Sequence, residues 1–369
     1  MKITIITVCM NSVNTIEKTI RSVIEQEYSD LEYIVIDGGS TDGTLEVLRQ
    51  YESYIDKWIS EPDNGIYDAM NKGIELSTGE VIAFLNSDDW YEKDAIKIVE
   101  NAFMEGEFDC VCCDNYVVKK DGSKVYYNAV GKPFEDLYFR MIYFHSAIFC
   151  RKKFFKRKEN FDLKYKIAAD YDWFLKVAKL GIKVSKVRQP IFTFCYGGIS
   201  SVKEIDCARE AKYIALKHLT GDKEQYKEKI EKRFCEIVLN ATDSATVRTE
   251  LINILGEDKT NILWGAGTRG RECIKWFKDL EISVEAIIDN DQSIWGQYLQ
   301  NIKVCSSDIL KGISCNVIIT PDRYSDDIRN ITEKIGGTSV HIFELIPLCM
   351  MIVCNLENGN TGTQIEMDI

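Results

Sequence analysis

The sequence predicts an α/β protein in which a mostly parallel sheet, sandwiched by helices, precedes a second and smaller α/β domain. Three observations support this. A chain of 369 residues exceeds what one core usually holds. Short β-rich runs alternate with helical periodicity over the first 120 residues, and the alternation restarts near residue 260. We expect a first domain over 1–205, a helical connector over 206–257, a small domain over 258–350 and a polar tail over 351–369.

The elements of the first half follow from short-range patterns. The near-continuous apolar runs are typical of buried parallel strands, and they lie at 3–8, 31–37 and 80–85. The helix after the first strand is indicated by Ile16, Ile20, Val23 and Ile24, which recur on one face. Asn14 followed by Glu17 predicts a capping box at its start. A shorter strand near residue 58 and a helix over 67–76 complete the series.

Composition excludes several classes of function. The formal net charge of -12 argues against a nucleic-acid-binding protein, because phosphate backbones are held by excess Lys and Arg. The apolar run at 345–354 contains a Pro and is half the length of a spanning helix. The 13 Cys are an odd count with no signal peptide ahead of them, which favours reduced thiols and a cytoplasmic location.

Acidic residues follow two of the predicted strands. Asp37 ends the run LEYIVID, and Asp88 lies in VIAFLNSDDW, just after a run of five apolar residues. In parallel sheets ligands bind beyond the carboxyl ends of the strands, so both acids are candidates for a binding site. The alternative is that they form turns and cap helices, which are ordinary positions for Asp. One cap does not require the whole NSDD cluster, so the alternative is weaker for Asp88.

At this point the sequence resembles a known family. The segments TVCMNSVNTIEKTIRSVIEQEYSDLEYIVIDGGSTDGT, SEPDNGIYDAMNKGIELSTGEVIAFLNSDDWY and AADYDWFLKVAKLG are similar to the family-2 glycosyltransferases of the GT-A fold, especially those that assemble bacterial surface polysaccharides. The resemblance covers roughly residues 1–205, with three motifs in the right order. It implies a nucleotide-sugar donor, usually a UDP-sugar, a divalent Mg or Mn ion, and inversion at the anomeric carbon.

The resemblance also implies roles for particular residues. Asp37 matches the acid that contacts uracil and ribose, Asp88 the metal-binding carboxylate of the DxD motif, and Asp170 the general base. Thr7, Asn86 and Ser87 would belong to the donor site. Two departures from the family pattern matter, since Asn86 stands where many members have the first Asp of DxD and Gly38 where many have a second Asp. Asn86 can act through its carbonyl oxygen or a water.

Further candidates each have an ordinary structural reading beside the functional one. The segment DNGIYDAMNKG offers three side chains that would read the sugar or uracil, or cap a helix, namely Asp63, Asn64 and Asp68. His145 is a candidate contact of acceptor or phosphate, or a core histidine. The segment CYGGIS resembles the glycine-containing segment that closes over the diphosphate in relatives, and Gly197 and Gly198 would allow close backbone approach to phosphate.

The run RKKFFKRK at 151–158 contrasts with the net negative charge of the chain. Its cations would rest on an anionic inner membrane leaflet or meet an acceptor's lipid diphosphate, which would make the protein peripheral at that membrane. The alternative is a solvated face without a partner.

The second domain is indicated by KTNILWGAGTRGRECIKWF. A strand precedes Gly265, Gly267 and Gly270, which fit GxGxxG, a helix follows, and Asp289 ends the next strand about 20 residues later. This spacing suits the opening βαβ unit of a Rossmann-like nucleotide-binding domain, in which the acid holds ribose. The alternative is a tight strand-to-helix turn that binds nothing.

Two classes of function follow. The first is a hexosyltransferase that moves a sugar from a UDP-sugar to a glycan or a lipid-diphosphate-linked oligosaccharide. The second is a non-catalytic regulator that binds nucleotide sugars. The presence of Asp37, Asp88 and Asp170 together favours the enzyme. We expect Asp170 rather than Asp172 to be the base, because Asp170 lies at the helix start and Asp172 already lies within the first turn. The sequence does not specify the sugar, the acceptor or the oligomeric state.

Overall fold

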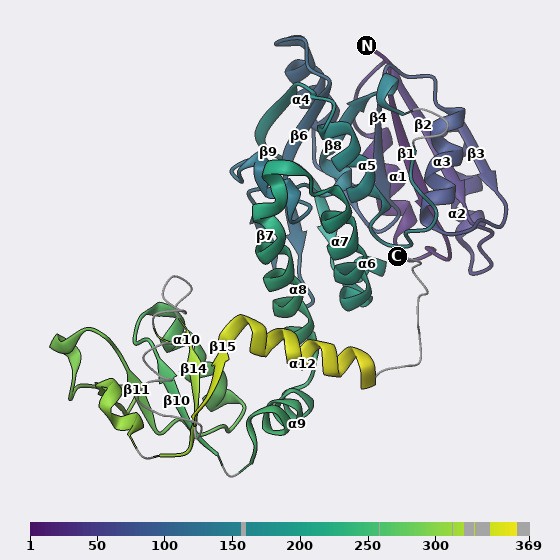
Figure 1. Ribbon diagram of the computed structural model, residues 1–369. Coiled ribbons are helices and arrows are strands. Elements are labelled where there is room, and N and C mark those ends of the chain that lie inside the picture. The colour runs from purple at the N-terminus through teal and green to yellow at the C-terminus, as the bar shows by residue number, and fades with distance from the viewer. Residues whose placement is uncertain (156–159, 258, 312, 321–327, 329–339, 360–369) are drawn as a thin grey trace. The chain divides into compact units, whose positions relative to one another are not determined.

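The computed structural model describes residues 1–155, 160–257, 259–311, 313–320, 328 and 340–359. The chain divides into two compact units, Met1–Ile230 and Glu231–Ile369, drawn in Figure 1. The division falls within the predicted connector, inside helix α8 (Lys227–Ala241).

Among its described residues the first unit contains a nine-stranded sheet. Along the main path the strands follow the order β3-β2-β1-β4-β8-β6-β9-β5, and β7 pairs with β6. The strands are β1 (Ile3–Cys9), β2 (Leu31–Asp37), β3 (Lys57–Ser60), β4 (Val81–Asn86), β5 (Trp90–Tyr91), β6 (Cys110–Val118), β7 (Lys124–Tyr127), β8 (Ile148–Arg151) and β9 (Val184–Cys195).

The prediction of a mostly parallel sheet is right only for the first half of this unit. Strands β3, β2, β1 and β4 are parallel, and so are β6 and β9. The remaining pairings, β4–β8, β8–β6, β6–β7 and β9–β5, are antiparallel, so the sheet is mixed. An apolar run indicates that a strand exists but not its direction. No α-helix separates β6, β7 and β8 in the chain, and β6 pairs antiparallel with both of the others.

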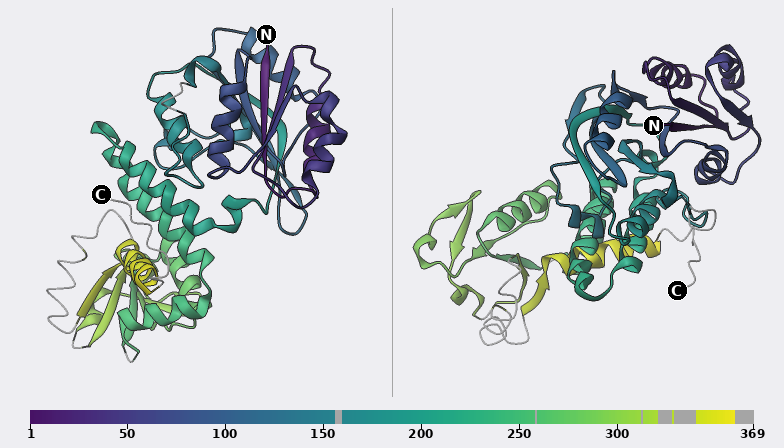
Figure 2. Two further views of the ribbon diagram at one scale, coloured as in Figure 1. Left: turned by 90° about the vertical axis from the view of Figure 1, so that its right-hand side faces the viewer. Right: turned by 90° about the horizontal axis from the view of Figure 1, so that it is seen from above.

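Helices cover both faces of this sheet, as Figure 2 shows. Buried side chains of α1, α2 and α4 share one hydrophobic cluster, and those of α3 and α5 share the other. The helices are α1 (Ile16–Ile24), α2 (Thr44–Gln50), α3 (Ile66–Leu76), α4 (Ala95–Met104), α5 (Ala169–Ala178), α6 (Ile199–Val202) and α7 (Glu204–His218). Single 3₁₀ turns lie at Glu52–Tyr54, Phe134–Tyr138, His145–Ala147, Lys152–Phe154 and Gly221–Tyr226.

The capping box predicted for α1 is wrong. The cap residue is Thr15, and its side chain makes no capping hydrogen bond. Instead, Ser12 accepts hydrogen bonds from the amides of Thr15 and Ile16 through its carbonyl oxygen, at 3.0 and 2.9 Å. The predicted apolar face is confirmed, since Ile16, Ile20 and Val23 are fully buried and Ile24 is half-buried against the same cluster.

The second unit is built on a six-stranded sheet with the order β12-β13-β11-β10-β14-β15, again among described residues. All pairings except β12–β13 are parallel. Its elements are α9 (Ser244–Leu255), β10 (Thr260–Trp264), α10 (Thr268–Asp279), β11 (Ala286–Ile288), β12 (Tyr298–Leu299), β13 (Ile302–Cys305), β14 (Cys315–Ile319), β15 (Val340–Glu344) and α12 (Leu345–Gly359), with 3₁₀ turns at Gln292–Ile294 and Ser307–Leu310.

The end of the chain differs from its prediction. Helix α12 continues to Gly359, so the predicted polar tail is helical over 351–359, and 360–369 lie outside the described residues. Leu348 and Ile352 are buried in the same cluster as residues of α9 and α10. The apolar run at 345–354 therefore forms the buried side of α12. Within the described part of the chain, no helix has the length and apolar character needed to cross a membrane.

Candidate functional site

The carboxyl end of β4 carries the NSDD cluster. Ser87 Oγ lies 2.8 Å from Ser12 Oγ, which ties this loop to the loop after β1. The Asp88 side chain is half-buried, and no hydrogen bond from another described residue reaches its carboxylate. Burial therefore raises the pKa of Asp88 above its usual range. A buried carboxylate left without a donor is a site where a cation would be stabilised.

Asp89, the second of the two adjacent acids after β4, has a structural role. It is 1% exposed, and its Oδ1 accepts a hydrogen bond from the Cys195 amide at 2.9 Å. Its own carbonyl oxygen accepts from Thr19 Oγ1 at 2.7 Å. Burial, together with the adjacent charge of Asp88, raises the pKa of Asp89 well above its usual range. Asp89 thus holds the end of β9 against the NSDD loop and leaves Asp88 for a ligand.

The glycine segment after β9 lies over Asp88. A Cβ atom on Gly198 would stand 2.9 Å from Asp88 Oδ2, so any side chain there would press on the carboxylate. Gly197 has φ +135°, a conformation that favours glycine, and its amide donates to Ser201 Oγ at 2.9 Å. The structure therefore brings Gly198 and Asp88 together, and the expected contact of this segment with the diphosphate stays a prediction.

His145 connects the end of β4 to the start of α5. Its Nε2 lies 3.2 Å from Asn86 Oδ1, and its Nδ1 lies 3.7 Å from Asp170 Oδ2. The His145 side chain is 20% exposed and that of Asp170 18%. Burial lowers the pKa of His145 in spite of the opposing charges of Asp170 and Asp88, so the ring is neutral near pH 7. Three residues that are distant in sequence thus form one cluster.

Asp170 is positioned by a tyrosine that the sequence interpretation missed. Tyr67 Oη donates to Asp170 Oδ1 at 2.8 Å, and also lies 2.7 Å from the Ile167 carbonyl oxygen. In the DNGIYDAMNKG segment the prediction considers only the polar residues as ligand contacts. Tyr67 could have been placed from the helical spacing of Tyr67, Met70 and Ile74, which form the buried face of α3.

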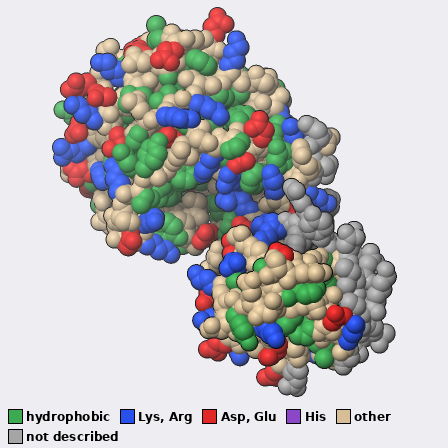
Figure 3. All heavy atoms as spheres, turned by 90° about the vertical axis from the view of Figure 1, so that its left-hand side faces the viewer, with side chains coloured by type: hydrophobic (Ala, Val, Ile, Leu, Met, Phe, Trp, Pro, Cys, Tyr) green, Lys and Arg blue, Asp and Glu red, His purple; other side chains and the backbone are tan. Residues whose placement is uncertain are grey.

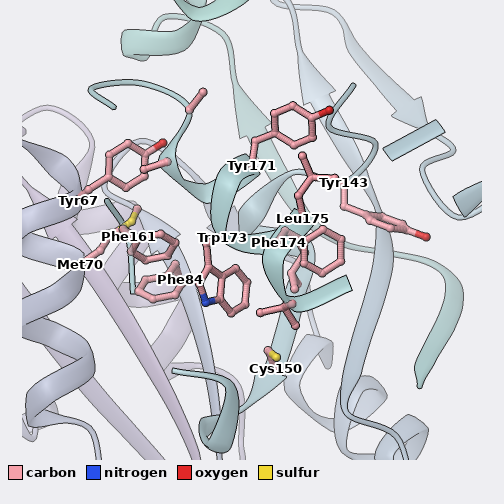
Figure 4. Close-up of a cluster of buried hydrophobic side chains, with 14 of the residues drawn as sticks. Tyr67, Met70, Phe84, Tyr143, Cys150, Phe161, Tyr171, Trp173, Phe174 and Leu175 are labelled. Carbon is pink, nitrogen blue, oxygen red and sulfur yellow. The ribbon is translucent and has the colours of Figure 1, made fainter. Parts of the chain in front are cut away.

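An aromatic floor supports this cluster. Figure 4 shows Tyr67, Phe84, Phe161 and Trp173 turned toward one another. Phe161 makes edge contacts with Phe84 and Trp173, with ring centroids 5.3 and 5.8 Å apart. The rings of Phe84, Phe161 and Trp173 line a small cavity, together with His145 and Asp170. Rigid aromatic packing restricts the rotamers of both polar residues.

Asp172 lies apart from this cluster. It is fully buried, and its Oδ1 lies 2.9 Å from His218 Nε2, while Lys176 Nζ lies 2.6 Å from its Oδ2. Burial opposes its ionisation, but the contacts with His218, Lys176 and Lys217 hold the pKa of Asp172 well below its usual range. Asp172 is therefore a structural ion-pair residue that joins α5 to α7.

Thr7 and Asp37 were both predicted to belong to the nucleotide-sugar site, but their side chains are used inside the protein. Both are fully buried. Thr7 Oγ1 accepts from Tyr33 Oη at 3.1 Å. The Asp37 carboxylate accepts from the amides of Gly39 and Ser40 at 3.0 and 2.9 Å, and from the hydroxyl of Ser60 at 2.7 Å. Burial alone would raise the pKa of Asp37, but these hydrogen bonds outweigh it and lower the pKa. The turn-forming alternative describes Asp37 in this structure.

Asp63 instead presents a carboxylate beside the end of β2. A Cβ atom on Gly38 would stand 2.5 Å from Asp63 Oδ2, so the glycine leaves room for that carboxylate. Asp63 Oδ1 accepts from the Gly65 amide at 2.8 Å. Asp68 accepts from the Asn64 amide at 3.0 Å, as the helix-start alternative predicted. Asp63 and Asn64 remain candidates for donor binding, because each retains exposed surface.

The described cations of the basic run contact groups of the protein, although Lys153 is exposed. Arg151 Nε donates to the Phe108 carbonyl oxygen at 2.7 Å, and Lys152 Nζ bonds the Ser77 carbonyl oxygen. Lys153 Nζ lies 2.6 Å from Asp109 Oδ1. Residues 156–158 of the run lie outside the described residues. For Arg151, Lys152 and Lys153 the structure shows contacts with protein groups, and their binding to a membrane stays a prediction.

In the second unit the GxGxxG sequence forms the turn between β10 and α10. A Cβ atom on Gly270 would stand 1.9 Å from the Gly265 carbonyl oxygen, so close packing of helix and strand requires glycine. Gly267 precedes α10 in an open position. Asp289 Oδ2 accepts from the Ala266 amide at 2.7 Å. The predicted turn is confirmed, and its acid is bonded to the turn itself.

The residues around Asp88 fit a divalent ion held partly by substrate. The described residues contain no group of three His, Cys, Asp or Glu side chains arranged to hold a metal. Mg²⁺ and Mn²⁺ sites of enzymes that use nucleotides need only one or two protein carboxylates, because phosphate oxygens and waters supply the other ligands. The half-buried, unpaired carboxylate of Asp88, open to the Gly198 side, meets this requirement.

Comparison with known proteins gives the class of this domain. Residues 4–163 match the family described as Glycosyl transferase family 2, and residues 257–343 match the one described as C2185-like, N-terminal. The first region is therefore a glycosyl transferase family 2 domain. Among solved structures, S. aureus TarS 1-349 in complex with UDP-GlcNAc aligns with a TM-score of 0.52 and 19% identity, covering 76% of this chain and 80% of that one. Such a likeness shows the fold, which is of the GT-A type.

Curated relatives are named as glycosyltransferases and polysaccharide synthases. The chondroitin synthase of Pasteurella multocida is 29% identical over 212 residues, which is 56% of this chain and 22% of that protein. A PGL/p-HBAD biosynthesis glycosyltransferase of Mycobacterium bovis is 30% identical over 158 residues, 41% of this chain and 60% of that one. The chain thus spans about a fifth of the length of the synthase that it matches.

Proposed function

We propose that this protein is an inverting, metal-dependent glycosyltransferase that moves a hexose from a UDP-sugar to a glycan or lipid-linked oligosaccharide in surface polysaccharide synthesis. The observation that carries the proposal is the cluster at the end of β4. It combines Asp88, whose carboxylate accepts no hydrogen bond from another described residue, with a second and separately positioned carboxylate, Asp170. The two acids suit the two chemical requirements of glycosyl transfer, which are neutralising the leaving diphosphate and removing a proton from the acceptor.

Each residue contributes a defined part of the reaction. Asp88 would hold Mg²⁺ or Mn²⁺, which when bound neutralises charge on the diphosphate. Asp170 takes the acceptor proton through Oδ2, because Tyr67 already donates to Oδ1. His145 lies between the two side chains, with its Nε2 3.2 Å from Asn86 Oδ1 and its Nδ1 3.7 Å from Asp170 Oδ2, and burial lowers its pKa. Burial of the cluster strengthens these electrostatic interactions.

The relatives support the donor class. One TarS structure contains UDP-GlcNAc, and a mannosyltransferase of Pyrobaculum calidifontis with a TM-score of 0.50 and 18% identity was solved with GDP-Man and Mn2+. We infer a uracil nucleotide from the sequence resemblance, with Asp63 and Asn64 in place of the buried Asp37 as the side chains that face it.

The test is a panel of nucleotide sugars with and without MnCl₂, in which released nucleotide and thermal shift are both measured. We expect a UDP-sugar to raise the melting temperature only with the metal and to be hydrolysed slowly in the absence of acceptor. If no nucleotide sugar shifts the melting temperature with either Mn²⁺ or Mg²⁺, the proposal is wrong. Binding without hydrolysis or transfer to any acceptor would support the regulator instead.

For the second unit we propose a Rossmann-like module that binds a nucleotide at the turn between β10 and α10. The parallel sheet, with β10 at its centre and glycines at the strand-to-helix turn, supports this. The engaged carboxylate of Asp289 favours the turn-only alternative. Equilibrium dialysis with UDP and with adenine dinucleotides, using a chain with Asp88→Asn to remove the first site, separates the two: one bound nucleotide supports the module, and none contradicts it.

A further inference from the structure

A row of side chains crosses four strands of the first unit in register. Trp90 of β5 pairs with Thr193 of β9, Thr193 pairs with Tyr116 of β6, and Tyr116 pairs with Tyr126 of β7. Directly paired residues project from the same face of a sheet. Trp90, Thr193, Tyr116 and Tyr126, here called the aromatic row, therefore share one face and extend over three strand spacings, about 14 Å.

The aromatic row faces away from the hydrophobic core. The neighbours Tyr91 and Phe192, which alternate with Trp90 and Thr193, are buried in the core cluster on the opposite side. Tyr126 is 51% exposed, and Trp90 and Tyr116 are half-buried. Thr193 is fully buried between them. Rings with exposed surface around a small buried residue form a platform with a shallow floor.

Lysines accompany the rings. Lys18 Nζ lies 2.8 Å from the ring centroid of Trp90, and Lys124 Nζ lies 4.2 Å from that of Tyr116. Lys124 is also paired with Glu92 at 2.8 Å, but no carboxylate of a described residue lies within ion-pair distance of Lys18. Figure 3 views the larger unit from the side of β7 and β9, and shows Lys and Arg side chains next to hydrophobic ones.

The aromatic row continues into a groove beside the NSDD loop. Trp90 also lines a groove of about 730 Å³ against the exposed side of α1, whose walls carry the cations Lys18, Arg21 and Lys93 and the acids Glu17 and Glu25. Arg21 is paired with Glu25 at 3.3 Å. Trp90, where the row meets the groove, lies two residues after Asp88 in the chain. A ligand lying along the row and the groove would therefore cross Trp90, next to the NSDD loop.

We propose that the aromatic row and the adjoining groove bind a saccharide chain that carries negative charges, and that this chain is the acceptor. The C–H face of a pyranose ring packs on an aromatic ring, its hydroxyls bond polar side chains, and lysines neutralise carboxylate or phosphate groups. Only the role as acceptor rests on the proposed function, because binding of the chain is a property of this face alone.

The test measures binding of defined oligosaccharides to the full chain by calorimetry without donor. The probes are a hexasaccharide containing glucuronate, a glycerol-phosphate oligomer and neutral chitohexaose. We expect one of the anionic probes to bind at least about tenfold more tightly than chitohexaose, and the better one identifies carboxylate or phosphate as the charge recognised.

Two variant pairs place the site. Tyr126→Ala should weaken anionic glycan binding about tenfold, whereas Tyr126→Phe, which keeps the ring, should retain it. Tyr54→Ala removes an equally exposed tyrosine, 61% exposed, outside the row and should have no effect. Lys18→Met should weaken binding, whereas Lys164→Met, which removes a lysine 4.9 Å from the Tyr165 ring, should not.

The outcomes separate this inference from the proposed function. UDP binding with Mn²⁺ is measured on the same samples and should be equal in Tyr126→Ala and the parent. Glycan binding that is unchanged in Tyr126→Ala and Lys18→Met, in variants that melt like the parent, overturns the inference whether or not UDP binds. Loss of glycan binding in these variants supports it even if no sugar transfer is found.

Discussion

At the scale of single residues, the two acids of the NSDD cluster divide their roles by direction. Asp89 is buried and bonded to the Cys195 amide, while Asp88 is half-buried and accepts no hydrogen bond from the other residues that the structure describes. An adjacent pair of acids is ordinarily repulsive, and burial together with the adjacent charge of Asp88 raises the pKa of Asp89 well above its usual range. This makes Asp88 the residue whose charge a ligand would compensate.

The first prediction follows from that asymmetry. Asp88→Asn should abolish the Mn²⁺-dependent binding of UDP and should leave the melting temperature without metal equal to or above that of the parent, because an uncompensated buried charge is removed. Calorimetry with UDP in Mn²⁺ and in EDTA checks this. A variant that binds UDP as tightly as the parent and still requires Mn²⁺ would show that the metal is held elsewhere.

The second prediction distinguishes the two acids at the start of α5. Asp170→Asn should lower single-turnover transfer by a factor of about 10² to 10⁴ with donor affinity nearly unchanged, as expected for loss of a general base. Asp172→Asn should mainly destabilise the fold, because His218 and Lys176 lose a buried partner. Near-parental transfer by Asp170→Asn would contradict the assignment.

The alternatives for the base are restricted by the structure. Asp114 is fully buried and accepts from the Val130 amide and from Tyr126 Oη, at 2.8 and 2.5 Å. Asp89 is buried as well. If Asp170→Asn retains transfer, His145 is the remaining candidate, and a pH–rate profile that shifts in a His145→Gln variant would identify it.

At the scale of elements, the sequence was sufficient wherever a pattern is local. Periodicity located α1 and α3, apolar runs located β1, β2 and β4, and glycine spacing located the turn after β10. It was insufficient where a contact joins distant segments. Nothing in the sequence around His145 indicates that it lies between Asn86 and Asp170, because that arrangement depends on how β4, the turn before β8 and α5 pack.

The inaccessibility of Asp37 has a similar cause. Its position at the end of β2 was correctly predicted, but Ser60, one of the donors that occupy its carboxylate, comes from β3. Only the register of β2 with β3, in which Asp37 pairs with Ser60, shows that the carboxylate is used internally. Residue identity and strand order alone do not distinguish a ligand contact from a structural one.

The third prediction concerns the glycine segment after β9. Gly198→Ala should weaken metal-dependent UDP binding, because the added Cβ would stand 2.9 Å from Asp88 Oδ2. The backbone there has φ -67°, which alanine adopts readily, so stability should change little. Gly267→Ala is a matched control in an open position with φ -69°. Equal UDP affinity in both variants would mean that this segment does not approach the metal site.

The fourth prediction concerns Glu32, which joins β1, β2, β3 and the turn before β4. Burial opposes its ionisation, but hydrogen bonds from Thr4 and Thr78 and the contact with Lys57 lower the pKa of Glu32 to about 2. A folded pKa below the unfolded value of about 4.3 means that this stability is present above pH 4.3 and is lost as the pH falls toward 2.

Glu32→Gln should therefore lower the free energy of unfolding by about 1–3 kcal/mol at pH 7, and the difference from the parent should shrink between pH 5 and pH 3. Urea unfolding at several pH values measures it. A difference that is independent of pH would show that the glutamate contributes through packing and not through its charge.

At the scale of the whole molecule, the two units have separate cores. The clusters of the first unit take their buried side chains from residues up to Ile230. Those of the second begin at Val247 in α9. A fragment ending near Gly256, at the end of the predicted connector, would thus include α9 without the strands that cover its buried residues, Val247, Leu251 and Leu255.

The last prediction therefore places the cut at Thr242, after α8 and before Asp243, whose side chain accepts from the Thr246 amide and caps α9. A chain of residues 1–242 should melt cooperatively and bind UDP with Mn²⁺ as tightly as the full chain, because every candidate donor and metal residue precedes position 200. A chain of residues 1–256 should bind equally well but aggregate more readily, since it exposes the apolar side of α9. Calorimetry and light scattering on both fragments measure these properties. A 1–242 fragment that melts cooperatively yet does not bind UDP would mean that the second unit completes the donor site, and the glycine turn after β10 would then have to be tested as part of it.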